Sequence, residues 1–403
     1  MARNEPSPDR TFPSTATAEP PDHVPLRQIV AYFLRLGALG FGGPVALCGQ
    51  MERELVDERG WLSKAEMREA IAVSQALPGP LAIQVGIFAG HMRGGFGGAW
   101  AGGWAFILPN FLMVAALGAL YVHFGDLPWM TAVFYGVSPV VIALILHSCW
   151  RLSWLGMEDW LQWAIAAAAF LATVILQAEV AIVFIAAGLL GVAYYGVIAV
   201  RHAGAAGGVV AAGAASHAPT ASTIGKLVLF FLKAGSLTFG SGLVIVPFLE
   251  RGLVHENGWL SPRAFLIAVA VGMMSPGPVV ITATFVGFVV AGFWGSLAST
   301  VAIFLPSFVF VLAVAPLLRR HRGSRYVQGF VKGAYGAAIG TILGATVLLG
   351  KIAIGDALTA VLALSALALL FRFKIPNPAL IAAAALVGLI AFPLIKPAWV
   401  LVQ

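Results

Sequence analysis

Long apolar segments follow one another along almost the whole chain, and they constrain the fold more than any other feature. A helix that crosses a bilayer core needs about 20 predominantly apolar residues, and most of the segments approach that length. Only 10% of the 403 residues are charged, against about 25% in soluble proteins. The sequence therefore predicts an all-α polytopic membrane protein in contact with the lipid bilayer. The expected spans are 28–47, 68–90, 98–122, 130–150, 160–177, 180–200, 226–249, 264–291, 294–318, 329–350, 353–371 and 378–395.

The first six of these segments are repeated by the last six. Phe33–Leu47 aligns with Phe231–Ile245 at an offset of 198, and Glu52–Ser63 aligns with Glu250–Ser261 at the same offset with nine of twelve positions identical. A constant offset over about eighty residues indicates an internal duplication. The expected organisation is a disordered cytoplasmic tail at 1–25, a transporter repeat at 26–200, a flexible Gly/Ala-rich linker at 201–224 and a second transporter repeat at 225–403.

The distribution of basic residues favours repeats of opposite orientation. If every segment spans, Arg27, Arg93 and Arg151 fall on one side, and in the second repeat the charge bias flips, with Arg319, Arg320, Arg322, Arg325, Lys332, Arg372 and Lys374 on that same side. Because positive residues gather in cytoplasmic loops, this pattern indicates inverted-topology repeats. Two features oppose it: six spans per repeat would leave the copies parallel, and Met51–Glu69 is basic on the wrong side. Inversion therefore requires a re-entrant or missed segment. The expected fold has about 10–13 membrane segments in two homologous halves, with broken or re-entrant helices.

A Pro-Gly-Pro motif interrupts one apolar segment in each repeat, at Pro78–Gly79–Pro80 and at Pro276–Gly277–Pro278. Proline inside a helix costs about 3 kcal/mol, and broken backbone is tolerated at membrane depth only where protein or a water-filled cavity satisfies it. The helix that restarts there presents N–H groups and the positive end of its dipole, which suits an anion. The alternative is a kink that only shapes packing, but a matched pair is typical of transporter binding sites. The polar candidates beside the motifs are Ser74, Gln75, Gln84, Ser275 and Thr282, and further candidates after mid-segment prolines are Asn110 and Ser307.

A second repeated motif, F-L-[RK]-x-G-x-x-x-F-G, places Arg35 and Lys233 about two turns into an apolar segment. An ionisable residue at that depth is a functional hypothesis, and the alternative is a long side chain that reaches back to the interface. Glycine-rich backbone follows both positions and permits an unwound segment or a close helix contact. The residues of this backbone included in the predicted substrate site are Gly42, Gly43, Gly240 and Ser241.

The third repeated motif, E-R-x-L-V-x-E-x-G-W-L-S, is polar and contains a tryptophan in each copy, Trp61 and Trp259. It predicts an interfacial element held by the aromatic residue, or alternatively a gate. In the gate interpretation, adjacent acidic and basic residues form ion pairs and a further glutamate takes part in proton coupling. The gating or coupling candidates are Glu52, Arg53, Glu58, Glu250, Arg251 and Glu256.

Several classes of function lack support in the sequence. Cys48 and Cys149 are far apart and form no CxxC pair, and the eight histidines are dispersed, so we expect neither a metal site nor a catalytic residue. The net charge of +7 is scattered over loops, which argues against nucleic-acid binding. There is no G-x-x-x-x-G-K-[ST] loop, and no cofactor is expected.

The duplicated GFGGP, E-R…G-W-L-S and P-G-P motifs resemble the chromate ion transporter family, in particular its long members with two repeats. The resemblance implies a multi-pass protein of the bacterial inner (plasma) membrane, not an enzyme, that exports chromate and confers chromate resistance, with halves of opposite orientation. The second copy departs from the first, because Ser241, Gly242 and Ser275 stand where the first has Gly43, Pro44 and Leu77. The two halves are therefore expected to play unequal roles.

The residues by themselves leave the substrate open. Chromate is a tetrahedral dianion nearly isosteric with sulfate, so a sulfate or other oxyanion transporter of the same architecture is the alternative, with sulfate otherwise a competitor. A passive channel is a third possibility, and a membrane-embedded enzyme would need a clustered nucleophile, metal or acid–base set. The sequence leaves a homodimer open and does not identify a coupling ion.

Overall fold

The computed structural model describes residues 20–40, 43–124, 127–175, 180–197, 223–238, 245–314, 325–373 and 375–395. Within these ranges every regular element is a helix, and five helices are long and apolar enough to cross a membrane, namely Leu81–Phe124, Trp129–Trp154, Val279–Ala313, Gln328–Ala353 and Asn377–Leu394. Several sequence expectations concern positions outside the described residues: the tail up to residue 19, the linker at 201–222, Gly42, Gly240, Ser241, Arg319, Arg320, Arg322 and Lys374.

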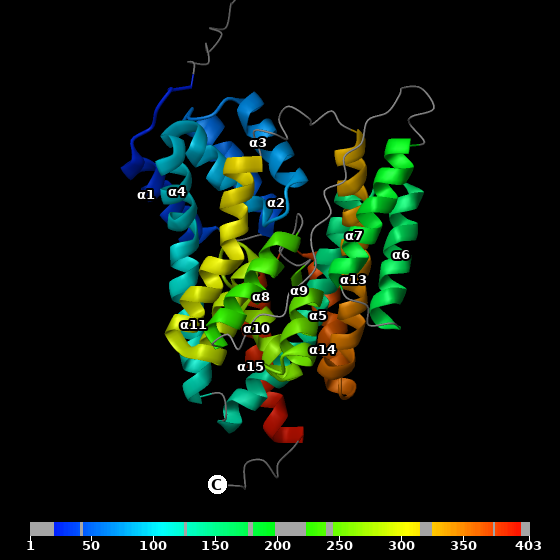
Figure 1. Cartoon of the computed structure of the whole chain (residues 1–403). Coiled ribbons are helices and arrows are strands. Elements are labelled where there is room, and N and C mark those ends of the chain that lie inside the picture. The colour runs from blue at the N-terminus through cyan, green and yellow to red at the C-terminus, as the bar shows by residue number, and fades with distance from the viewer. Residues whose placement is uncertain are drawn as a thin grey trace, which may run out of the picture.

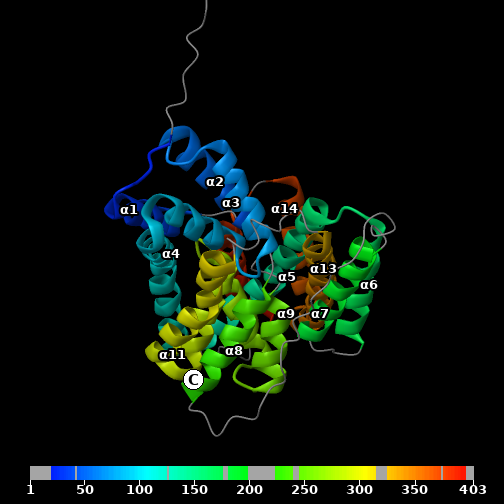
Figure 2. The same cartoon turned by 45° about the horizontal axis from the view of Figure 1, so that its top comes forward.

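The two repeats form one helical bundle (Figure 1). The first contains α1 (Leu26–Leu39), α2 (Gly43–Glu52), η1 (Arg53–Glu58), α3 (Lys64–Ala76), α4 (Leu81–Phe124), α5 (Pro128–Gly156), α6 (Trp160–Val174), α7 (Val180–Gly191) and η2 (Val192–Val197). The second contains α8 (Thr223–Leu237), α9 (Ile245–Glu250), η5 (Arg251–Glu256), α10 (Pro262–Met274), η6 (Val279–Ile281), α11 (Thr282–Val309), η7 (Phe310–Val314), α13 (Arg325–Ala353), α14 (Ala357–Arg372) and α15 (Asn377–Ile395). In both ribbon views α1, α4 and α11 lie on one side of the bundle, and α6, α7 and α13 lie on the other (Figure 2).

The first repeat enters the bundle twice from the same end. The N–H of Val24, just before α1, donates to the carbonyl of Arg93 at 2.9 Å, and α1 then passes inward until Gly37 packs on the backbone of Phe106. The chain returns through α2 and η1 to Trp61, whose carbonyl accepts a hydrogen bond from Arg93. Helix α3 passes inward again, and the first part of α4 brings the chain back to Arg93. The expected spans over 28–47 and 68–90 are therefore re-entrant helical hairpins.

Helix α4 is itself a tight hairpin of two helices joined at Gly95, where φ is 60°. The two arms touch through Gly90 and Gly98, because a Cβ added to Gly98 would lie 2.2 Å from the carbonyl oxygen of Gly90. Only glycine permits both the left-handed turn and this approach of backbones. Helix α11 repeats the turn at Gly292, where φ is 61°. The glycines that recur every fourth residue, at 86, 90, 94, 98 and 102, are thus packing positions.

Helices that correspond in the two repeats run antiparallel, which shows that the repeats are inverted. On α4 and α11, Trp100 stacks on Phe308 with ring centroids 4.6 Å apart, whereas Phe111 contacts Phe293 at 6.1 Å. Residue numbers therefore rise along one helix as they fall along the other. Inverted repeats, predicted from the charge pattern, are confirmed by this geometry.

Helices α5 and α13 show the same relationship. Lys332 Nζ lies 2.6 Å from Glu158 Oε2, and the Cys149 thiol faces the carbonyl of Ile339 at 3.7 Å. Again the number rises on α13 as it falls on α5. The two repeats are thus related by inversion along most of their length.

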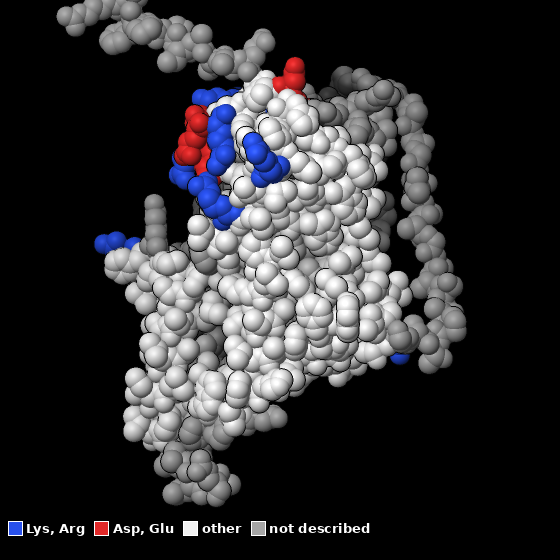
Figure 3. Space-filling model, turned by 90° about the vertical axis from the view of Figure 1, so that its left-hand side faces the viewer, with Lys and Arg blue, Asp and Glu red and all other residues white. Residues whose placement is uncertain are grey.

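The re-entrant hairpins also explain the basic loop over residues 51–69, which appeared to lie on the wrong side. Trp61 and Glu66 both contact Arg93, so this loop lies at the same end of the bundle as Arg93. The apparent conflict arose because two segments were counted as spanning when they turn back. Figure 3 shows most of the charged side chains in view gathered at the upper end of the molecule, above a broad white surface with basic atoms only at its left and lower right edges.

The third repeated motif forms the connection between the two re-entrant hairpins. Gly60 has φ of 59° and ends the π-helical segment η1, Trp61 follows it, and Ser63 caps the N-terminus of α3. The second repeat uses Gly258, with φ of 59°, and Ser261 in the same way. Because a left-handed residue is required at that point, the glycine of the motif is explained by backbone geometry.

Candidate functional site

Both Pro-Gly-Pro motifs form turns between half-helices inside the bundle. Helix α3 ends and α4 begins on either side of Gly79, whose φ is 135°, and α10 and α11 flank Gly277, whose φ is 97°. Side-chain-bearing residues rarely adopt such φ values, so each motif glycine has a conformational reason. The prediction that each segment stops and restarts at this motif is confirmed.

Each turn is held by the opposite repeat. The N–H of Gly79 donates to the carbonyl of Thr238, which directly follows α8, and the N–H of Gly277 donates to the carbonyl of Gly40, which directly follows α1, at 2.9 Å for the second pair. Gly40 and Thr238 are separated by the offset of 198 that also separates the two glycines. The two hydrogen bonds are therefore equivalent contacts related by the pseudo-two-fold symmetry of the inverted repeats.

Side chains of the long helices α4 and α11 also lie against the turn of the opposite repeat. A Cβ on Gly79 would lie 2.7 Å from Ser307 Oγ, and a Cβ on Gly277 would lie 2.7 Å from Asn110 Nδ2. Ser307 and Asn110 are counterparts at an offset of 197, and each directly follows a proline of its helix. Each Pro-Gly-Pro turn therefore faces a polar residue of the other repeat.

The polar groups around the turns are incompletely hydrogen-bonded. Gln84 Nε2 donates to the carbonyl of Pro78 at 2.6 Å, and Asn110 Nδ2 donates to two backbone carbonyls at 3.1 and 3.3 Å. Among the described residues, eight buried side-chain atoms have no hydrogen-bond partner, and four of them belong to candidate residues of the two turns, namely Ser74 Oγ, Gln84 Oε1, Asn110 Oδ1 and Ser307 Oγ. Native proteins contain few such atoms, and each requires an explanation. Their presence beside both turns marks a place where a ligand or water completes the hydrogen bonding.

Comparisons with known proteins identify the family. A family model described as Chromate transporter matches residues 27–192 and 225–389. The chain is 43% identical to a chromate transport protein of Cupriavidus metallidurans, over 97% of this chain and 99% of that one. It is 41% identical to a probable chromate transport protein of Synechococcus elongatus, over 91% and 95%, and 34% identical to a chromate transport protein of Pseudomonas aeruginosa, over 96% and 97%.

The chain belongs to the chromate transporter family. The two matched ranges of the chromate transporter model correspond to the two inverted repeats. No solved structure matches the chain. Within the described ranges, no three His, Cys, Asp or Glu side chains come together as metal ligands.

The remaining candidate residues of this chromate transporter differ from one another in their hydrogen bonds and exposure. In the second repeat the Ser275 hydroxyl donates to the carbonyl of Gly272 at 2.9 Å, and the Thr282 hydroxyl donates to that of Val279 at 2.8 Å. Each of these hydroxyl protons is therefore already used in a hydrogen bond to a nearby backbone carbonyl. Gln75 is exposed, and Gly43 is the first residue of α2.

Arg35 and Lys233 lie on exposed parts of the re-entrant helices α1 and α8. Arg35, half exposed, forms an ion pair with the buried carboxylate of Glu54. Lys233 Nζ lies 5.7 Å from the centroid of the Phe248 ring. Neither of these contacts reaches a Pro-Gly-Pro turn, so the substrate-facing role of the two cations remains a prediction.

Charged residues of the third motif form ion pairs across five positions of the chain. Arg53 lies 3.5 Å from Glu58, and Arg251 lies 2.8 Å from Glu256, while Glu250 faces His255 at 2.9 Å. Each pair is separated by five positions because residues of a π-helix align at that spacing. The predicted gate role of the pairs Glu52 with Arg53 and Glu250 with Arg251 stays a prediction.

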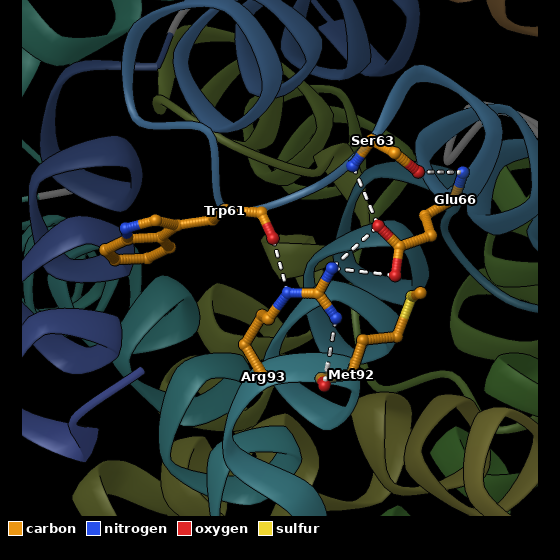
Figure 4. Close-up of polar contacts among 5 residues, drawn as sticks. All are labelled: Trp61, Ser63, Glu66, Met92 and Arg93. Atoms are coloured by element: carbon orange, nitrogen blue, oxygen red, sulfur yellow. Dashed lines mark hydrogen bonds and ion pairs between the residues drawn. The ribbon is translucent and has the colours of Figure 1, made fainter. Parts of the chain in front are cut away.

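The sequence patterns missed one buried ionic network of the first repeat (Figure 4). Arg93 Nη2 lies 2.7 and 2.6 Å from the two carboxylate oxygens of Glu66, and Arg93 Nε donates to the carbonyl of Trp61. Glu66 also accepts a hydrogen bond from the N–H of Ser63 at 2.7 Å. This network joins the tip of the α4 hairpin to the start of α3. The capping pattern S-K-A-E was a visible signal for Glu66, but nothing in the sequence linked it to Arg93.

The second repeat has no equivalent network, because Val290 and Ala264 occupy the positions of Arg93 and Glu66. The two hairpin tips of this family member therefore differ in how firmly they are attached.

Proposed function

We propose that this chain is a secondary transporter that carries chromate by alternating access, with the two Pro-Gly-Pro turns as its substrate site. The observation that carries this proposal is the reciprocal hydrogen bonding of Gly79 to Thr238 and of Gly277 to Gly40. Through these bonds, the turn before the restarted helix of each repeat is held in place by a backbone carbonyl of the other repeat. The high identity to chromate transport proteins over nearly full length supports chromate as the substrate.

The geometry suits an oxyanion for a physical reason. The first turns of α4 and α11 present backbone N–H groups and the positive ends of two helix dipoles. Ser307, buried beside Gly79, has a hydroxyl that can donate to an anion. In a water-excluded setting such dipoles act more strongly than they would in water. Arg35 and Lys233 add positive charge at the outer parts of the re-entrant helices.

The reciprocal contacts support alternating access. Movement of one repeat against the other displaces each turn relative to the helix end that holds it, because that helix end belongs to the other repeat. The turns are then exposed to one side of the membrane or to the other without either helix having to unwind.

We further propose that the chain lies in the bacterial inner membrane with the Arg93 end in the cytoplasm, and that it exports chromate and confers resistance. Basic residues at that end support the orientation. An inside-negative potential favours outward movement of an anion by about 2.3 kcal/mol per charge per 100 mV.

The test is chromate uptake into inverted membrane vesicles, with and without excess sulfate. We expect saturable uptake with counterflow, which a passive channel does not show. If sulfate flux equals chromate flux and modest sulfate abolishes chromate uptake, the protein transports oxyanions in general and is not specific for chromate. Vesicles without the protein and vesicles with the Gly49→Ala variant are the controls, since a Cβ on Gly49 meets no atom within 4 Å.

A further inference from the structure

Two buried amide oxygens beside the turns have orientations that the surrounding backbone determines. Gln84 Nε2 faces the carbonyl of Pro78 at 2.6 Å, and Asn110 Nδ2 faces two backbone carbonyls. A flipped amide would place oxygen against oxygen in both cases, so each nitrogen must face the carbonyl and each oxygen must point away from it. Gln84 Oε1 and Asn110 Oδ1 are therefore acceptors, and both are buried without a donor.

An acceptor of this kind disfavours a fully deprotonated oxyanion. Sulfate and the chromate dianion have only acceptor oxygens, so contact with an amide oxygen sets two partial negative charges against each other. A buried acceptor that stays unpaired costs about 1–3 kcal/mol. A ligand that carries an O–H group removes that cost, because its proton donates to the amide oxygen.

Chromate differs from sulfate in just this property. Chromate takes up a proton near neutral pH, whereas sulfate and selenate do so only in strong acid. The Gln84 amide group and the Ser307 hydroxyl both lie beside Gly79, because a Cβ on this glycine would lie 2.9 Å from Gln84 Cδ and 2.7 Å from Ser307 Oγ. Gln84 Oε1 is an unpaired acceptor, so the two side chains together offer one acceptor and one donor.

We propose that the species bound at the first turn is hydrogen chromate, with its O–H donating to Gln84 Oε1 and an unprotonated oxygen accepting from the Ser307 hydroxyl. This inference rests on the proposed function. Asn110 Oδ1 offers the same kind of acceptor beside Gly277 in the second turn. Selection of the protonated monoanion separates chromate from sulfate, a distinction that charge and shape do not supply.

Among the described residues, the two amides make no hydrogen bond to a titratable side chain. Their own hydrogen bonds go only to backbone carbonyls, and α11, which faces them, carries no charged residue. The ionisable groups on α1, α2, η1, α3, α4, α8 and α10 are Arg27, Tyr32, Arg35, Cys48, Glu52, Arg53, Glu54, Asp57, Glu58, Lys64, Glu66, Arg68, Glu69, His91, Arg93, Tyr121, His123, Lys226, Lys233 and Arg263. The pH dependence of binding is therefore assigned to the ligand.

The decisive measurement is equilibrium binding of chromate to the purified full chain in detergent across the pH range in which chromate loses its proton. Above that transition we expect the apparent dissociation constant, expressed in total chromate, to rise about tenfold per pH unit, because only the protonated fraction binds. An apparent constant that stays level through the transition overturns the inference.

Competition by other tetrahedral oxyanions separates protonation from shape. Selenate matches chromate in shape but has no proton at neutral pH, so we expect it to compete poorly. Arsenate keeps a proton at neutral pH and should compete. A site that hydrogen-bonds a ligand O–H can reject an analogue without one by as much as about 10⁴-fold. Competition by selenate as strong as by arsenate would contradict the inference.

A matched pair of variants links the effect to Gln84. Gln84→Met keeps the side-chain volume and removes the acceptor. We therefore expect the ratio of the selenate to the chromate dissociation constant to fall by at least tenfold. The rise of the apparent chromate dissociation constant with pH should weaken by the same factor. Thr346→Val, at a buried hydroxyl on α13, should leave both unchanged. If Gln84→Met does not insert stably, the wild-type pH series and the selenate comparison still decide the matter.

The inference and the proposed function fail in different ways. Absence of chromate binding at every pH, with no uptake into vesicles, removes the proposed function. Chromate binding that is tight but indifferent to pH and to selenate leaves the proposed function intact and removes only the hydrogen chromate species.

Discussion

The N–H of Gly277 lies 2.9 Å from the carbonyl oxygen of Gly40, although the two residues belong to different repeats. The equivalent contact joins Gly79 to Thr238. Neither repeat therefore completes its own Pro-Gly-Pro turn, and the geometry of each turn depends on how the two repeats are arranged. Changes that shift one repeat are transmitted to the turn of the other through this backbone hydrogen bond and through the facing side chain, Ser307 or Asn110.

Gly277→Ala should abolish transport while the protein still inserts. The φ of 97° at this position costs a residue with a Cβ about 1–3 kcal/mol, and the Cβ would also meet Asn110 at 2.7 Å. Chromate uptake into vesicles, normalised to protein, measures the effect. Gly49→Ala on α2 is the matched control, and equal uptake by the two variants would show that the turn is not part of the transport path.

Inverted repeats predict opposite accessibility of two exposed positions at the starts of corresponding helices, one in each repeat. In a background in which the buried Cys48 and Cys149 are replaced by serine, Lys64→Cys and Arg263→Cys each present a single exposed thiol at the start of α3 or α10. A membrane-impermeant thiol reagent should label Arg263→Cys in intact cells and Lys64→Cys only after permeabilisation. Labelling of both from one side would contradict the inverted arrangement.

Arg93→Val should destabilise the protein more than the double change Arg93→Val with Glu66→Ala. The single variant leaves the Glu66 carboxylate without its cation, at a cost of about 1–3 kcal/mol. The double variant reproduces the pair that the second repeat contains, Val290 and Ala264, and leaves no unpaired charge. Thermal unfolding in detergent measures which of the two variants is more stable. A double variant less stable than the single one would show that the unpaired Glu66 charge is not the cause of the destabilisation.

The same network has a pH dependence of known sign. Burial raises the pKa of Glu66, but hydrogen bonds from Arg93 and Ser63 outweigh burial and hold the pKa below its usual range. A carboxyl group with a lowered folded pKa stabilises the protein above its unfolded pKa, and this contribution disappears as the pH falls through the folded value. The stability difference between wild type and Glu66→Gln should therefore shrink in acid, and a difference that grows in acid would contradict this assignment.

Replacement of Arg35 tests whether it acts on the substrate. Arg35→Ala alone would leave Glu54 buried without its partner, so the informative variant is Arg35→Ala combined with Glu54→Gln, with Lys233→Ala added. We expect impaired chromate resistance with unchanged membrane insertion. Full resistance in the combined variant would make both residues interfacial side chains with no part in transport.

Much of the fold followed from local patterns in the sequence. The Pro-Gly-Pro interruptions, the duplication and the inversion were all predictable, because proline chemistry, a fixed offset and the positions of basic residues are local or statistical signals. The re-entrant course of 28–47 was not, since an apolar segment of that length fits a spanning helix equally well. Its return is set by contacts such as that of Trp61 with Arg93, which are separated in sequence.

The candidate site was predictable in part for the same reason. Gly79, Gly277 and Gln84 were indicated by the motif itself. Ser307 and Asn110 had only their position after a proline to mark them, and their placement against the turn of the opposite repeat depends on how the two repeats pack. The pairing of Arg35 with Glu54, which lies on the π-helical segment η1, joins residues 19 positions apart, and no pattern in the sequence indicated it.

The reciprocal hydrogen bonds also determine when the site is completed during synthesis. Thr238 follows Gly79 by 159 residues (238 − 79), which at typical translation speeds corresponds to about 8–30 s. Throughout that interval the nascent first repeat contains every residue of its own turn but lacks the carbonyl that holds it. A chain released before the second repeat is inserted is therefore exposed to membrane quality control with an unpaired backbone group in its interior.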